Sequence, residues 1–233
     1  MLLQRFRYYP PVLMYHTLDQ RYAQKATYVS FSLFCRQMDF ISERGFDVMR
    51  PDDFVRSFSE NNLKRKQIAV TFDDGYKDNL KAVDLLAKKN IPAVIFVITD
   101  WLGREGYLTE DDLLYIRKNT PVIIGSHTLT HDYLPERDPR VRQKTIIESK
   151  HFLENLLGEE IVLFSYPIGG YNKNIVTEVK NAGYEGAFAT NRGKGADEFC
   201  VKRINVNNRD KTIKFAYKLS GYYWAGRKFK SEC

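Results

Sequence analysis

Two adjacent carboxylates follow an apolar run in the first third of the chain. Residues 71–76 are TFDDGY, and residues 68–72 predict a buried strand that ends at Asp73 and Asp74. Burial and mutual repulsion penalise two ionised carboxylates there, and a bound cation removes that cost. Adjacent side chains point in different directions, so one can bind a metal while the other faces a bound water. The alternative is a pair of aspartates that cap a helix.

Two histidines follow another predicted strand. Residues 126–131 are SHTLTH, and the spacing of His127 and His131 brings both imidazoles to one face if the segment makes a helical turn. The chain has only four histidines, so such a pair favours metal binding over two unrelated loop residues. Two histidines and one carboxylate form a catalytic zinc set that leaves a position for water. Asp132 is a candidate outer partner, or simply an exposed residue.

A glycine-rich turn and an early histidine complete the set of candidates. Residues 164–172 are FSYPIGGYN, and a Pro-x-Gly-Gly turn brings the backbone close to a ligand, so the N–H of Ile168 or Gly169 is a candidate donor to an oxyanion. A plain turn before a helix is the alternative. Cleavage of an amide also needs a proton donor on the leaving-group side. His16 is the candidate, because His151 falls inside a predicted helix, although His16 also fits a structural role.

Each of these polar groups follows a predicted strand. Strands are expected over 11–15, 46–49, 68–72, 92–98, 122–124, 161–166 and 184–190. Helices are expected over 31–44, from Pro51 onward, and over 78–89, 139–157 and 173–182. The repeated unit of strand, polar loop and helix predicts an α/β architecture, and in α/β barrels the carboxyl ends of the strands carry the chemistry.

Length and composition are typical of one globular domain. The chain has 233 residues, of which 43% are hydrophobic and 28% charged. Its net charge is +7, yet no basic helix with interleaved aromatics and no nucleic-acid motif is present, so no nucleic-acid partner is predicted. Three cysteines are too few for a disulfide framework. Residues 1–10 lack the apolar stretch of a secretory signal, and no run of about 18 apolar residues exists. We therefore expect a cytoplasmic location.

The three motifs together resemble a known family. TFDDGY, SHTLTH and SYPIGGYN, in this order, resemble the leading motifs of the polysaccharide deacetylases (NodB-like, carbohydrate esterase family 4), over about residues 11–206. The resemblance implies a single domain, 1–233, with a distorted (β/α) barrel of about seven strands. It implies a divalent metal, zinc as first choice with cobalt or nickel as alternatives, bound by Asp74, His127 and His131. Asp73 matches the base of the family.

Two departures from the family pattern affect other residues. Many members carry an arginine, paired with the base, at the position of Ser165; Arg203 is a substitute here, or else a surface arginine. Many members also have a late Leu-x-x-His motif that supplies the acid, whereas no histidine follows His151. Residues 13–16, LMYH, resemble a branch related to enzymes that modify poly-N-acetylglucosamine, in which the acid lies early, and this makes His16 the acid. The residues predicted to contact the substrate are Tyr166, Pro167, Ile168, Gly169, Tyr171 and Arg203.

These residues predict a metal-dependent hydrolase that removes an N-acyl group, in the first place N-acetyl, from an amino sugar or glycan precursor. Asp73 takes a proton from water and His16 protonates the departing amine. An amidohydrolase acting on a small non-sugar amide is one alternative, and a non-catalytic carbohydrate-binding module is another.

The C-terminal residues 207–233 form a basic, aromatic tail. Its aromatic residues are Tyr222, Tyr223, Trp224 and Phe229, and its cations include Lys218, Arg227, Lys228 and Lys230. Aromatic residues beside cations suit the interface of an anionic membrane, so peripheral contact with the inner membrane is one expectation. A C-terminal helix packed on the barrel is the other. The oligomeric state is not predicted.

Overall fold

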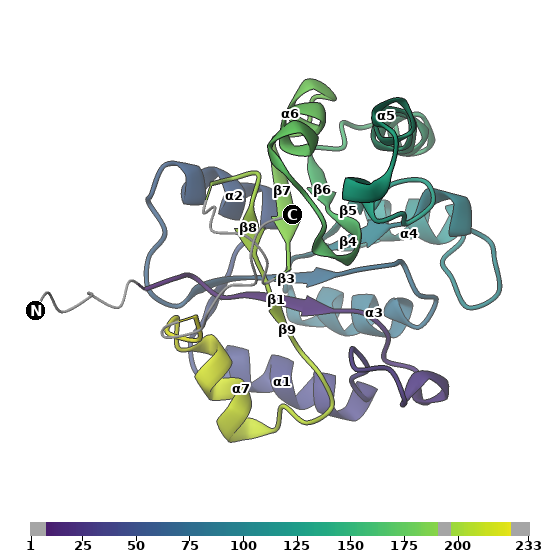
Figure 1. Cartoon of the computed structure of the whole chain (residues 1–233). Coiled ribbons are helices and arrows are strands. Elements are labelled where there is room, and N and C mark those ends of the chain that lie inside the picture. Colours follow the sequence, from purple (N-terminus) through teal and green to yellow (C-terminus); the bar gives the residue numbers. More distant parts are fainter. Residues whose placement is uncertain (1–7, 191–196, 225–233) are drawn as a thin grey trace, which may run out of the picture.

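The computed structural model describes residues 8–190 and 197–224, and it is built around a parallel barrel (Figure 1). Eight strands follow one another in the order β8-β7-β6-β5-β4-β3-β1-β9, and every pairing between them is parallel. A ninth strand, β2 (Asp47–Val48), pairs with the first residues of β3. The barrel strands are β1 (Val12–Tyr15), β3 (Gln67–Phe72), β4 (Ala93–Val97), β5 (Val122–Ser126), β6 (Leu163–Ser165), β7 (Gly186–Ala189), β8 (Val201–Lys202) and β9 (Ile204–Asn205).

One bent segment closes the barrel. β8 pairs with β7, and β9 pairs with β1, while Arg203 alone separates β8 from β9. The segment 201–205 therefore joins the last strand of the sheet to the first, and counting it as one strand gives the seven that the family resemblance implied. This strand was not predicted from the sequence, because five residues with two cations among them carry no periodic apolar signal.

In the described part of the chain, seven α-helices cover the outside of the barrel (Figure 1). They are α1 (Phe31–Glu43), α2 (Pro51–Ser59), α3 (Asn79–Lys89), α4 (Glu110–Asn119), α5 (Pro139–Leu157), α6 (Lys173–Asn181) and α7 (Thr212–Leu219). The five helices predicted from the sequence are present, with ends within one or two residues. α4 was missed: a capping box between Thr109 and Asp112 starts it, but only Leu113 and Ile116 are buried, so its periodic signal is weak.

Strand alternation decides which side chains enter the barrel. Successive residues of a strand point to opposite faces, and one inner cluster of buried residues contains Val12, Ala69, Val94, Phe96, Leu163, Phe188 and Val201. Phe54 and Val55 of α2 belong to the same cluster, and Val55 lies against Gly186 at the start of β7. Apolar residues thus fill the amino end of the barrel. Two residues further along β3, β6 and β8 lie Thr71, Ser165 and Arg203, so the same register places polar groups inside the carboxyl end.

The described part of the C-terminal tail packs on the barrel. The Phe215 ring of α7 lies edge-on to Phe40 of α1, with centroids 5.9 Å apart, and Lys218 is buried with its Nζ 2.5 Å from Asp210 Oδ2. Lys218 is therefore a packing residue and does not face a membrane, which corrects its predicted role. The other predicted cations of the tail and Phe229 lie outside the described residues. Within the described ranges, no helix has the length and apolarity needed to span a bilayer.

Candidate active site

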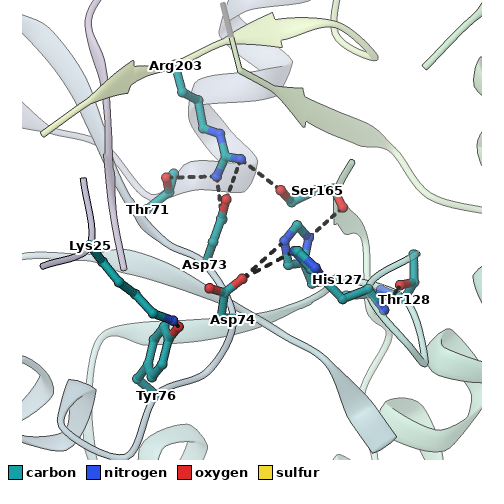
Figure 2. A network of polar contacts seen from close by, with 11 residues as sticks. Lys25, Thr71, Asp73, Asp74, Tyr76, His127, Thr128, Ser165 and Arg203 are labelled. Carbon is teal, nitrogen blue, oxygen red and sulfur yellow. Dashed lines mark hydrogen bonds and ion pairs between the residues drawn. The ribbon is translucent and has the colours of Figure 1, made fainter. Parts of the chain in front are cut away.

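The predicted catalytic residues meet at the carboxyl end of the barrel (Figure 2). Asp73 and Asp74 follow β3, and His127 follows β5. His16 follows β1 in the same way, and Arg203 enters from the junction of β8 and β9. Because parallel strands have their carboxyl ends at one face, residues far apart in the sequence share one site.

Asp74, His127 and His131 form a cluster of metal-ligand type. Their ligand atoms all lie within 4.8 Å of one another. Asp74 Oδ1 is 3.6 Å from His127 Nε2 and 3.5 Å from His131 Nε2. These separations exceed a hydrogen bond. They match the roughly 3.4 Å between two ligands that lie about 2.1 Å from a tetrahedral zinc ion. The donor set and the spacing both fit a divalent metal.

The two histidines converge by a route that the sequence did not predict. The expected helical turn is wrong, because residues 127–131 form an irregular loop. Thr128 and His131 both have left-handed backbone conformations, with φ of 68° and 63°, and the Thr128 hydroxyl accepts a hydrogen bond from the His131 N–H. Asp74 is also left-handed, with φ of 74°. Each such non-glycine residue costs on the order of 1–2 kcal/mol, and this strain is concentrated at the site.

His127 is held in one orientation. Its Nδ1 lies 2.8 Å from the carbonyl oxygen of Ser165, and this contact directs Nε2 toward Asp74. The ring is 1% exposed, and burial lowers its pKa to about 4, so the neutral imidazole that a metal requires is present at neutral pH. His131 is more exposed and lies with its ring centroid 5.7 Å from that of Trp101.

Asp132, the predicted outer partner of the ligands, has other contacts. Its carboxylate accepts a hydrogen bond from the Thr130 hydroxyl and pairs with Arg137 at 2.6 Å. The outer partner that the structure shows is the backbone carbonyl of Ser165, on a different strand. A backbone acceptor leaves no signal in the sequence.

Asp73 is paired with Arg203 inside the barrel. The two guanidinium NH2 groups donate to the two carboxylate oxygens at 2.6 and 2.7 Å. Arg203 also donates to Ser165 Oγ, to Thr71 Oγ1 and to the carbonyl of Ala189, so all five of its N–H groups are used. The guanidinium carbon lies 5.5 Å from the ring centroid of Phe96 and 5.9 Å from that of Phe188, and these two rings contact each other at 5.4 Å.

This pairing revises two expectations for Arg203. Arg203 is 1% exposed, so the alternative of a surface arginine is wrong. Protein atoms accept hydrogen bonds from all of its N–H groups, so Arg203 positions Asp73 and does not bind substrate. Burial acts to raise the pKa of Asp73, but the charge of Arg203, assisted by His127, outweighs burial and holds that pKa well below its usual value. Asp73 is therefore ionised at neutral pH.

His16 lies at the same end of the barrel, on the loop that follows β1. A charge on its ring would act to lower the pKa of Asp73, more weakly than Arg203 or His127 does. Its carbonyl oxygen accepts a 2.7 Å hydrogen bond from the Asn79 side chain. Among the described residues, neither His16 Nδ1 nor Asn79 Oδ1 has a hydrogen-bond partner, although both atoms are buried. Such unpaired atoms mark a region completed by water or ligand.

The turn after β6 places one of its predicted substrate residues at the surface. Ile168 is 51% exposed and has a left-handed φ of 57°. Gly169, with φ of 70°, leaves no room for a side chain, because a Cβ would lie 2.1 Å from Thr190 Oγ1. The Gly169 N–H donates to the Tyr166 carbonyl, so the N–H of Ile168 is the remaining oxyanion candidate of the two.

Three other predicted substrate residues are buried in this turn. Tyr166 is fully buried, and its hydroxyl donates to the carbonyl of Phe199. Tyr171 stacks on it with centroids 5.0 Å apart, and Pro167 is buried as well. These three buried residues stabilise the turn, so they are not positioned for direct contact with a substrate.

An aromatic group beside the ligands was missed in the sequence. Tyr76 stacks on Tyr107 at 5.2 Å, and Tyr107 packs against Trp101 at 5.0 Å, next to His131. Tyr22 contacts Tyr76 from the other side at 5.4 Å. Tyr76 belongs to the TFDDGY motif and could have been selected, whereas the others come from separate loops.

Comparisons with known proteins agree with this arrangement. The family model described as Polysaccharide deacetylase matches residues 60–187, more than half of the chain. The chain belongs to the polysaccharide deacetylase family. Its members are carbohydrate deacetylases, and the family and the fold expected from the resemblance are confirmed.

Individual relatives span most of the chain. YxkH of Bacillus subtilis (strain 168) is 26% identical over 202 residues, which cover 84% of this chain and 71% of that protein. A peptidoglycan-N-acetylglucosamine deacetylase of Bacillus cereus is 30% identical over 139 residues, 59% of this chain and 62% of that protein. The crystal structure of a Bacillus cereus polysaccharide deacetylase is 28% identical with a TM-score of 0.78, and it covers 90% of this chain and 68% of that one.

Proposed function

We propose that the chain is a divalent-metal-dependent hydrolase that removes an N-acetyl group from an amino sugar of a glycan or glycan precursor. The observation that carries this proposal is the cluster of Asp74, His127 and His131 directly beside the buried Asp73–Arg203 pair. The names of the relatives support the choice of an N-acetylated sugar, since one acts on peptidoglycan N-acetylglucosamine.

Zinc is the metal we propose, with cobalt and nickel as alternatives. Two imidazole nitrogens and one carboxylate oxygen form a set that suits zinc and leaves a position open. A cation there would polarise the acyl carbonyl and acidify the attacking water, which offsets the weak basicity of a carboxylate with a lowered pKa.

The protein groups supply the proton transfers. Asp73, fixed by both arms of Arg203, accepts a proton from the attacking water. The Ile168 N–H is the donor that we propose for the oxygen of the tetrahedral intermediate. His16 donates a proton to the nitrogen as the C–N bond breaks. Water and the amide thus become a carboxylate and a free amino sugar.

The test is acetate release by the zinc-loaded protein from N-acetylated oligosaccharides and from small non-sugar amides. Wild type should release acetate from the sugars, and Asp73→Asn should lose about 10²- to 10⁴-fold in rate while it keeps its zinc. Asp132→Asn is the matched control, because that carboxylate contacts Arg137 instead of the ligand cluster. Sugar binding without acetate release would identify a binding module, and release from amides alone would identify another amidohydrolase.

The place of action is a separate proposal. We keep the expectation of a cytoplasmic enzyme that contacts the anionic inner membrane; its support is the exposure of Ile213, Tyr217 and Tyr222, at 89%, 47% and 37%. Liposome co-sedimentation would compare wild type with a variant that carries serine at these three positions. Equal sedimentation with anionic vesicles at low salt would remove this surface from the proposal.

A further inference from the structure

An exposed lysine is fixed beside the metal-ligand cluster. Lys25, on the loop between β1 and α1, donates from Nζ to the Tyr76 hydroxyl at 2.5 Å. Its ammonium group also lies 5.0 Å from the ring centroids of both Tyr22 and Tyr76. Tyr76 comes two residues after the ligand Asp74, and Figure 2 shows the Lys25–Tyr76 pair next to that carboxylate. These contacts hold a positive charge at the edge of the site.

Aromatic rings connect this lysine to the other side of the cluster. The chain of contacts runs from Tyr76 through Tyr107 and Trp101 to the ligand His131, with centroid separations between 5.0 and 5.7 Å. Aromatic rings offer flat apolar faces with polar edges, which suits the apolar face of a sugar ring. Tyr76 is 2% exposed, so the half-buried rings of Trp101 and Tyr107 are the ones that a sugar can contact. The Tyr76 hydroxyl links these rings to Lys25.

Lys25 also lines a polar cavity of about 290 Å³. Its walls come from the β1–α1 loop and from the turn before α7, and they consist of Ala23, Gln24, Lys25, Ala26, Tyr28, Asn207, Asn208 and Arg209. Two cations and three amides stand among these residues, and none of them is acidic. Asn207 Oδ1 accepts from the Arg209 N–H, and Asn208 Oδ1 accepts from the Ser30 N–H. Because the amide oxygens are engaged, the NH2 groups are the ends that remain as donors.

The two cations of this cavity have no ion-pair partner within the described residues, although the Asp74 carboxylate lies near the Lys25–Tyr76 pair. Neither Lys25 nor Arg209 forms an ion pair there. Asp210, the acidic residue next to the turn, is buried against Lys218 Nζ and the Asn207 N–H. The cavity therefore presents positive charge and hydrogen-bond donors, the chemistry that binds phosphate and carboxylate groups.

We propose that this cavity binds an oxyanion, a phosphate or a carboxylate, carried by the same sugar that loses its acyl group. This inference rests on the proposed deacetylase function and narrows its substrate to anionic acylated sugars. Lys25 would be shared between the cavity and the aromatic rings, and Arg209 would bind the anion from the opposite wall.

Binding tests the inference without catalysis. The Asp73→Asn protein would be titrated calorimetrically with N-acetylglucosamine, its 1-phosphate, an N-acetylated amino sugar with a carboxylate, and inorganic phosphate. The phosphorylated or the carboxylated sugar should bind about tenfold more tightly than the neutral sugar, and the tighter of the two identifies the anion. Lys25→Ala and Arg209→Ala should each remove most of this gain. Lys88→Ala, which removes an exposed cation of α3, is the matched control for net charge.

The outcomes separate the inference from the function. Equal binding of neutral and anionic sugars overturns the inference and leaves deacetylation intact. Inorganic phosphate that binds as tightly as the sugar phosphate also overturns it, because the cavity is then a phosphate site unrelated to the sugar. Preferential binding of the anionic sugar with no acyl release from any sugar would sustain the anion site in the cavity and overturn the proposed function. With turnover, the ratio of kcat/KM for anionic over neutral sugar should fall about tenfold in Lys25→Ala and stay unchanged in Lys88→Ala.

Discussion

The two sides of the site differ in how completely their polar groups are satisfied. On the inner side, Asp73 and Arg203 are buried, and every guanidinium N–H has an acceptor. On the outer side, His16 Nδ1 and Asn79 Oδ1 are buried without a partner among the described residues, and Lys25 forms no ion pair there. The hydrogen bonds of the proposed base are therefore all formed before a substrate binds. The region expected to hold the leaving group still contains polar atoms without partners.

The two sides therefore contribute differently to the proposed reaction: the inner side to proton transfer, and the outer side to substrate binding. A fully hydrogen-bonded inner side fixes the position and the charge of the base, so little reorganisation accompanies proton transfer. Unpaired atoms on the outer side gain partners only when water or substrate enters, so binding energy can be used there. Four changes would break or sharpen the contrast, and they run from the largest expected effect to the smallest.

Loss of a metal ligand should abolish function on both sides at once. His127→Ala removes one of three ligands and leaves the Ser165 carbonyl without its imidazole partner. We expect loss of bound zinc, measured by elemental analysis after gel filtration, together with loss of acetate release. His151→Ala, an exposed change on α5, should keep full occupancy. Full zinc content in His127→Ala would show that this ligand assignment is wrong.

Removal of Arg203 should destabilise the inner side. Arg203→Met keeps an apolar stem beside Phe96 and Phe188 but leaves Asp73 buried without a counter-charge. Breaking a buried ion pair in this way costs about 3–5 kcal/mol of unfolding free energy. Ser165→Ala removes a single hydrogen bond from the same guanidinium and should cost about 1–2 kcal/mol. Denaturant unfolding of both variants measures the difference. Equal losses of unfolding free energy would show that the Asp73–Arg203 ion pair stabilises the fold no more than a single hydrogen bond does.

Acid should weaken the metal-free protein through His127. Burial lowers the pKa of His127 from 6.5 to about 4, so the unfolded chain binds a proton at higher pH than the folded chain does. The unfolding free energy should therefore fall as pH drops from about 6.5 to about 4, by on the order of 3 kcal/mol in total. Asp73, with its lowered pKa, adds a loss only at more acidic pH. In His127→Leu, the decrease in unfolding free energy between pH of about 6.5 and about 4 should disappear. If the decrease remains, other groups cause it.

The outer side should respond mildly and in a different observable. Asn79→Ala removes the hydrogen bond to the His16 carbonyl, and with it the support of the proposed acid. We expect a loss of about tenfold in kcat and a displaced alkaline limb of the pH–rate profile, with zinc content unchanged. Asn119→Ala on α4, which loses only a bond to its own helix, is the control. If the alkaline limb is unchanged in both Asn79→Ala and His16→Ala, a residue other than His16 is the general acid.

Local motifs made much of the inner side predictable. Asp73, Asp74, His127 and His131 stand in two short runs after strands, so parallel topology brings these two runs to the same end of the barrel. The partner of Asp73 could not be derived in this way. Arg203 lies 130 residues from Asp73 along the chain, and its inward direction depends on the register of a strand with no apolar periodicity. Sequence reasoning therefore left Arg203 open between a substitute and a surface residue.

The outer side was less accessible to sequence reasoning. Its residues come from separate loops, and no periodic pattern links Lys25, Tyr107 and Arg209. The left-handed conformations of Thr128 and His131 were equally invisible, because nothing in these residue types signals them. A helical turn was the simpler expectation for the spacing, and the strained loop replaced it.

The closure of the barrel at Arg203 also orders events during synthesis. A nascent chain folded only as far as β7 would leave the edges of β1 and β7 unpaired and would bury Asp73 without the charge of Arg203. The segment 201–205 pairs both edges and supplies that charge in one step (Figure 1). We therefore expect ribosome-bound or prematurely terminated chains that lack this segment to be inactive. Hydrolytic activity then reports that translation has passed the last strand.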